Sequence, residues 1–173
     1  TYFKKNDWIE LYNTTPQPVD VAGMYLTDHL DKPFKFQIPS SETLNTIIPP
    51  YGFLVLWADK LSPIQQLHTD FKLEDEGGLV MLISADHTWS DTLFYPSHAG
   101  YESVGLYPNG GMNAYIMNVP TLSSTNQWSS YVQYIRESDL PTSTPATEIT
   151  KRYLHVTWEN GRINLWGTPQ GHV

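Results

Sequence analysis

The stretch LEDEGGLVMLIS, residues 73–84, places an acidic turn directly before a continuous apolar run. Every position of LVMLI is apolar, so both faces of a strand formed by these residues would be buried. The run FLVLW at residues 53–57 has the same character. The glycine pair and the acidic residues before LVMLI favour a solvated turn. Together the two runs predict the central strands of a two-layer β structure.

Shorter apolar runs recur before residue 120 and predict further strands. Each is roughly four to eight residues long and is bounded by proline, glycine, asparagine or aspartate. A helical interpretation would meet a proline or glycine at nearly every turn. We therefore expect an all-β fold, an antiparallel β-sandwich. Its additional strands are expected at residues 8–12, 19–26, 34–38, 92–95 and 115–119.

The composition excludes several classes of partner. The chain has 173 residues, of which 40% are apolar and 13% aromatic, enough for one folded core. Ten lysines and arginines stand against 18 aspartates and glutamates, and the resulting charge of −8 argues against nucleic acid or an anionic membrane surface as partners. The absence of cysteine excludes disulfides and thiolate metal sites. No apolar run approaches about 18 residues, so we expect no membrane insertion.

The segment NQWSSYVQYI, residues 126–135, has two interpretations. Its aromatic and apolar residues follow the helical spacing i, i+3, i+4 and i+7, but they also alternate as in a strand. Residues rich in proline, threonine and serine follow and are typical of a linker. Asn160 and Gly161 then form the preferred pair for a type I′ turn between two apolar runs, which predicts a C-terminal β-hairpin.

These features divide the chain into three predicted parts. They are a sandwich at residues 1–126, a connecting segment with a linker at 127–150, and the hairpin at 151–173. A lone hairpin is marginally stable in water. The hairpin is therefore expected either to dock on the sandwich or to begin a further domain.

The order of the motifs resembles the lamin-tail domain family, in the form found in exported bacterial proteins. The resemblance covers about residues 7–126, and the main motifs are DWIELYN at 7–13, IIPPYGFLVLWADK at 47–60 and ESVGLYPNGG at 102–111. It implies an immunoglobulin-like β-sandwich without catalytic residues. It also implies an adhesion, anchoring or interdomain-contact role, in the periplasm, on the cell surface or outside the cell. From about residue 144 the chain resembles the opening of a secretion-sorting domain.

Three polar residues are candidates for fixing turns. In a strand formed by DWIELYN, Ile9 and Leu11 would face the core, and Glu10 would lie on the outer face or under a loop. Glu10 and Asn13 match typical positions of the family, and both side chains can bond to nearby backbone. A ligand contact is the alternative role. Asp28 in TDHLDKP is expected to close a turn, since two carboxylates without the EF-hand pattern bind calcium poorly, and no metal site is expected.

Aromatic residues are the remaining indication of binding. Six tryptophans and eleven tyrosines are many for this length. Exposed aromatics stack on sugars or anchor protein partners, although sandwich cores also take up these residues. The candidates for a ligand-contacting surface are Trp89, Tyr101, Tyr107 and Trp128.

Three functions are compatible with the sequence. The first is a non-catalytic lamin-tail module with a protein or cell-envelope glycan as partner, expected as a monomer without a cofactor, a deep polar pocket or strongly shifted pKa values. The second is a carbohydrate-binding module, which predicts two or more coplanar exposed aromatics. The third is a hydrolase built from loops, which predicts a cleft with converging histidines and carboxylates. No HExxH, P-loop or G-x-S-x-G motif supports the third.

Overall fold

The computed structural model describes residues 6–61 and 66–141, together with the backbone of two later strands at 155–159 and 162–166. Nearly all of its regular structure is β-strand, which confirms the predicted fold class. The strands of the first part are β1 (Asp7–Tyr12), β2 (Val19–Asp20), β3 (Tyr25–Thr27), β4 (Phe36–Gln37), β5 (Ile47–Ile48), β6 (Phe53–Ala58), β7 (Leu67–His68), β8 (Gly77–Ile83) and β9 (Ser90–Pro96). The later strands are β10 (Ser103–Leu106), β11 (Ala114–Met117), β12 (Tyr131–Tyr134), β13 (His155–Glu159) and β14 (Arg162–Trp166).

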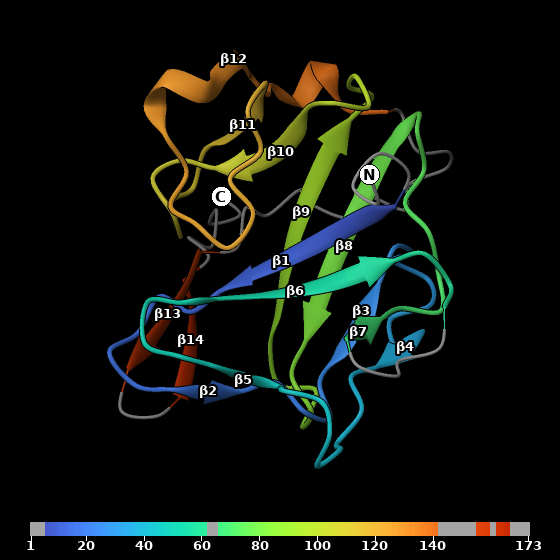
Figure 1. Ribbon diagram of the computed structural model, residues 1–173, viewed down its shortest axis with the longest axis vertical. Coiled ribbons are helices and arrows are strands. Elements are labelled where there is room, and N and C mark those ends of the chain that lie inside the picture. Colours follow the sequence, from blue (N-terminus) through green and yellow to red (C-terminus); the bar gives the residue numbers. More distant parts are fainter. Residues whose placement is uncertain (1–5, 62–65, 142–154, 160–161, 167–173) are drawn as a thin grey trace, which may run out of the picture.

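Two sheets face each other and form the sandwich. One contains β1, β6 and β7 in that order, and the other contains β4, β3, β8 and β9 (Figure 1). The two fully apolar runs become β6 and β8, and each has a neighbouring strand on both sides, as predicted. The strand pairs of these sheets are antiparallel except β6 with β7, where Leu56 lies opposite Leu67 in a parallel register. β2 and β5 form a small separate sheet.

Apolar burial between the sheets holds the sandwich together. Leu26 in β3, Ile38 after β4 and Leu56 in β6 are each 0% exposed. Full burial of such a side chain contributes roughly 1.5–3 kcal/mol. Ile9 of β1 belongs to the same core cluster and Leu11 packs against it, so β1 turns the predicted face inward.

The apolar run at residues 19–26 forms two strands with a turn between them, where a single strand was expected. The Met24 N–H donates to the Val21 carbonyl at 3.1 Å, and Gly23 has a φ of +80°. This φ is readily available to glycine and allows the chain to reverse. Val21 and Met24 remain buried in the core, so the apolar pattern continues through the turn.

The later strands β10, β11 and β12 form a third sheet. The ambiguous segment at 126–135 is a short 3₁₀ turn, Trp128–Ser130, followed by β12, so the strand interpretation describes most of it. A second small core lies beneath this sheet, and Phe94 of β9 packs against it. Because β12 pairs with β11, strand pairing continues beyond the boundary predicted at residue 126.

The C-terminal hairpin is present as β13 and β14. His155 pairs with Trp166 and Glu159 with Arg162, and the two strands form a sheet of their own. The predicted turn residues Asn160 and Gly161 lie outside the described residues. The boundaries at 126 and 150, and the docking of the hairpin, stay predictions.

Asn13 joins two loops at the end of β1. Its side-chain amide lies within hydrogen-bonding distance of the carbonyls of Gln17, Ile48 and Pro49, at 2.7, 3.2 and 3.0 Å. Its Oδ1 accepts hydrogen bonds from the Thr15 N–H and hydroxyl at 2.9 and 2.8 Å. Asn13 is 5% exposed, so water cannot replace these partners at low cost.

We expect Asn13→Ala to lower the free energy of unfolding by about 2–3 kcal/mol, because it leaves several buried backbone groups without a partner. Asn113→Ala, at an exposed loop asparagine, is the matched control and should change stability by less than about 0.5 kcal/mol. Chemical denaturation of the purified chain measures both values. Equal stability of the two variants would contradict the role assigned to Asn13.

Candidate functional site

Five aromatic side chains gather on the third sheet and beside it. We call them the aromatic cluster, and they are Tyr107, Tyr115, Trp128, Tyr131 and Tyr134. Trp128 is 63% exposed and Tyr134 is 49% exposed, which is unusual for such large apolar rings. Of the four aromatic residues selected from the sequence, the structure brings Tyr107 and Trp128 together, with 5.3 Å between ring centroids.

A β-bulge creates the aromatic cluster. Tyr115 of β11 lies opposite Tyr134 of β12, and the next pairs are Ile116 with Gln133 and Met117 with Tyr131. The extra residue, Val132, lets Tyr131 and Tyr134 both reach Tyr115, at 4.3 and 5.4 Å between ring centroids. In a regular strand, residues three apart point to opposite faces, so the bulge is required.

The rings of the cluster are tilted against one another. The interplanar angle is 53° between Tyr107 and Trp128, 55° between Trp128 and Tyr131, and 33° between Tyr115 and Tyr131. A flat platform for a sugar chain requires coplanar rings, which this arrangement does not supply. A group of exposed aromatics with non-coplanar rings instead fits the inserted side chains of a protein partner.

Loss of hydration, together with the adjacent Tyr115 hydroxyl, raises the pKa of Tyr131 to about 12.

The other two aromatic candidates lie elsewhere. Trp89 is half-buried and packs against the main core, so its role is structural. Tyr101 is 71% exposed but has no ring contact with the aromatic cluster among the described residues. The sequence offered no sign that Tyr115 and Tyr134 join this cluster through Tyr131, because the bulge that brings them together depends on strand pairing.

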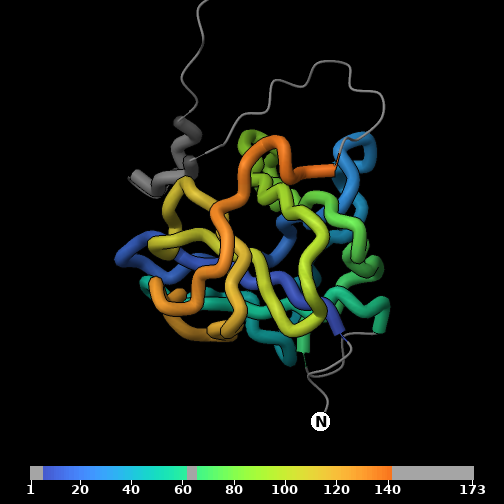
Figure 2. Tube along the Cα trace, turned by 90° about the horizontal axis from the view of Figure 1, so that it is seen from above, coloured from blue at the N-terminus to red at the C-terminus, as the bar shows by residue number. Residues whose placement is uncertain are grey.

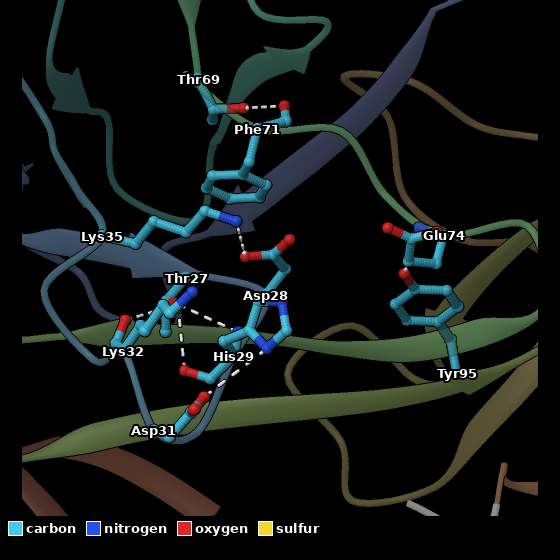
Figure 3. A network of polar contacts seen from close by, with 10 residues as sticks. All are labelled: Thr27, Asp28, His29, Asp31, Lys32, Lys35, Thr69, Phe71, Glu74 and Tyr95. Carbon is cyan, nitrogen blue, oxygen red and sulfur yellow. Dashed lines mark hydrogen bonds and ion pairs between the residues drawn. The ribbon is translucent and has the colours of Figure 1, made fainter.

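Asp28 links the ends of the loop after β3, but Thr27 makes the bonds inside the turn (Figure 3). The Asp28 carboxylate accepts a bond from Lys35 Nζ at 2.6 Å, and that ammonium lies 5.0 Å from the centroid of the Phe71 ring. The Thr27 hydroxyl donates to the Lys32 carbonyl at 2.8 Å and accepts from the His29 N–H at 3.0 Å.

Glu10 lies beneath a loop from the third sheet. Its carboxylate accepts a hydrogen bond from the Ser123 N–H at 2.6 Å, which ties the outer face of β1 to residues 113 positions later. Figure 2 places the segment that contains Ser123, coloured yellow to orange, beside the blue N-terminal strand. Partial burial raises the pKa of Glu10, and the Ser123 N–H offsets part of this rise.

A large open cavity lies beside β1. Its volume is about 1180 Å³, and both faces of β1, the inner face of β8 and β9, and β10 line it. The cavity is open, and more of its lining is apolar than polar. Asp7 lines the cavity, and burial raises the pKa of its carboxyl, with a further rise from the nearby Asp75. Burial also raises the pKa of Tyr95 to about 12. The Tyr95 hydroxyl accepts a hydrogen bond from the Glu74 N–H.

The raised pKa values of Asp7 and Glu10 predict a pH-dependent stability. A carboxyl whose pKa is higher in the folded state stabilises the fold while protonated, below its ordinary value of 3.8 or 4.5, and this contribution is lost as pH rises through the folded-state pKa. The double variant Asp7→Asn/Glu10→Gln should therefore lose less stability than the parent chain between about pH 4 and pH 7. Thermal melting across this interval measures the difference, and an identical pH dependence in both chains would contradict it.

No metal-binding arrangement is found in the described part of the chain. A buried carboxylate and a histidine do meet, at Asp59 Oδ1 and His68 Nδ1, 2.8 Å apart. Asp59 also accepts bonds from the Asn6 side chain and the Leu61 N–H, so it joins three segments of backbone. Among residues 6–61 and 66–141, no three histidine, aspartate or glutamate side chains are placed to hold a metal ion.

No described helix is long and apolar enough to cross a membrane.

The fold and the surface define a class: an immunoglobulin-like β-sandwich with an exposed aromatic surface and an open cavity. The model of the Lamin Tail Domain family matches residues 2–120 of the chain. The chain therefore belongs to the lamin tail domain family, a non-enzymatic, protein-interaction type of domain. No curated protein and no solved structure is detectably similar to the chain.

Proposed function

We propose that this chain is a non-catalytic interaction module, which provides adhesion, anchoring or interdomain contact in an exported bacterial protein. The observation that carries the proposal is the exposed aromatic cluster. Trp128 contacts both Tyr107 and Tyr131, so it is held in place from two sides while 63% of it remains exposed. Tryptophan and tyrosine held rigidly at a surface lose little conformational entropy on binding and dominate protein interfaces.

A protein is the preferred partner, and a cell-envelope glycan is the second candidate. The tilt between neighbouring rings supports the protein partner, since protein side chains can enter between non-coplanar rings. The exposed indole of Trp128 supports the glycan, because a single ring face is enough to stack on one sugar. Both partners would contact the same residues, so the partner chemistry must be tested directly.

Binding of cell-envelope fractions to the immobilised chain tests this proposal. We expect Trp128→Ala to weaken binding about tenfold or more, since tryptophan is among the residues that dominate such interfaces. Val119→Ala is the matched control, because Val119 is 57% exposed just after β11 but belongs neither to the aromatic cluster nor to the bulge. Equal binding by both variants would refute the aromatic cluster as the interface.

Treatment of the fractions separates the two partners. Protease digestion should abolish binding of a protein partner, and periodate oxidation should abolish binding of a glycan. Loss of binding after periodate alone would identify the glycan, and not a protein, as the partner.

Trp128 is mostly exposed, so its substitution should lower the free energy of unfolding by less than about 1 kcal/mol. Thermal melting checks that the loss of binding is not a loss of fold.

A further inference from the structure

The cavity beside β1 lies between two strands that each end a sheet. β1 is the outer strand of the sheet β1-β6-β7, and β10 is the outer strand of the sheet β10-β11-β12. Both strands line the same cavity of about 1180 Å³. We call this space the β1 groove. It does not include any residue of the aromatic cluster, so it is a separate surface.

Hydrogen-bonding groups of the β1 backbone are directed at the groove. The Asn13 N–H donates to the Gly52 carbonyl at 3.0 Å, one pair beyond the β1–β6 register. Antiparallel pairs alternate, so Trp8, Glu10 and Tyr12 direct their N–H and C=O groups away from β6. These groups have no strand partner in the described part of the chain. An extended segment could therefore pair with them.

β10 offers a shorter edge on the opposite side. The Tyr107 N–H donates to the Asn113 carbonyl at 3.1 Å, which continues the β10–β11 pairing by one residue. By the same alternation, Val104 directs its backbone groups away from β11. The Leu106 carbonyl, on the same edge, already accepts a bond from the Asn126 side chain at 2.9 Å. The open part of this edge is therefore centred on Val104.

The floor of the groove is apolar and only partly covered. Val80, Leu82 and Leu93 line it from β8 and β9, and all three are partly exposed although they lie on the inner face of a sandwich. Leu11 of β1 also lines the groove and is also partly exposed. An added strand would cover these side chains with every second residue, because alternate residues of a strand face the same side.

The ionisable side chains of the groove are mostly acidic. Its carboxylates are Asp7, Glu10, Glu74, Asp75, Asp91 and Glu102. No lysine or arginine lines it within the described ranges, and His98 is the one basic side chain there. A second copy of this chain, with its net charge of −8, is a poor electrostatic match for this surface. A basic segment is a good match.

We propose that the β1 groove binds an extended basic segment of a partner protein, which adds a strand between β1 and β10. Apolar residues of the segment face Leu93 and Val80, and lysine or arginine residues alternate with them and reach the surrounding carboxylates. The backbone of the segment pairs with Trp8, Glu10 and Tyr12. The proposal goes beyond the aromatic cluster, since it concerns a different surface and a different mode of binding.

The probe is a blocked peptide of alternating valine and lysine, roughly eight residues long, enough to span β1. We expect saturable binding, and amide hydrogen exchange at Trp8, Glu10 and Tyr12 should slow about tenfold or more at saturation. A peptide with glutamate in place of lysine should not bind measurably. Methylation of alternate backbone nitrogens of the lysine peptide should abolish binding, because it removes donors to the strand edge and leaves the side chains unchanged.

Charge reversal locates the site on the protein. Asp75→Lys should weaken binding of the lysine peptide about fivefold at low salt, since it replaces an attractive charge by a repulsive one. Asp31→Lys makes the same change in net charge at a side chain that is 78% exposed in the loop after β3, outside the groove, and should leave affinity unchanged. Both positions are exposed, so neither variant is expected to unfold.

Several results would overturn the proposal. They are equal affinity for the lysine and glutamate peptides, binding that tolerates backbone methylation, or equal weakening by Asp75→Lys and Asp31→Lys. If the β1 amides are already protected from hydrogen exchange before peptide is added, another segment of the polypeptide fills the groove. If that protection increases with protein concentration, a second copy of the chain fills it. Trp128→Ala should leave peptide binding intact, so failure of this proposal and failure of the aromatic interface are distinguishable.

Discussion

The structure depends on the burial of one β-sheet against another around β6 and β3. Leu56 from one layer and Leu26 from the other are fully buried, and each lies on a strand with neighbours on both sides. Such a contact gains from apolar burial only if both strands present the correct face, so it also sets the register of the strands that pair with them. The small second core beneath the third sheet has far fewer members and adds to this arrangement rather than creating it.

The sandwich is well packed at its centre and open along one side. Asn13 secures the end of β1 by bonding to loop carbonyls, and Glu10 secures its middle through Ser123. Among the described residues the outer edge of β1 has no strand partner, and it faces a cavity with a partly exposed apolar floor. An open strand edge is a hazard for unwanted association. The carboxylates around this edge repel most acidic chains, including further copies of this one, and leave it selective for basic segments.

The aromatic residues illustrate how position decides the role of a side chain. Trp89 and Trp128 are chemically identical, but the first packs against the core and the second is exposed beside two tyrosines. A bulge in β12 assembles this exposed group, and it also explains the misleading helical spacing of Trp128, Tyr131 and Ile135. Spacing by three and four residues occurs in helices, but a short turn followed by a bulged strand produces it as well.

The sequence by itself determined the strand content, the two central strands and the family. Fully apolar runs between proline and glycine can satisfy burial on both faces only inside a layered β structure, so local pattern was sufficient. Local pattern was insufficient at Gly23, where the apolar pattern continues through a turn. The aromatic cluster, the parallel pairing of Leu56 with Leu67 and the β1 groove were decided only by tertiary structure. Each joins residues that are distant in sequence, and such pairing depends on packing and hydrogen bonds that no local spacing encodes.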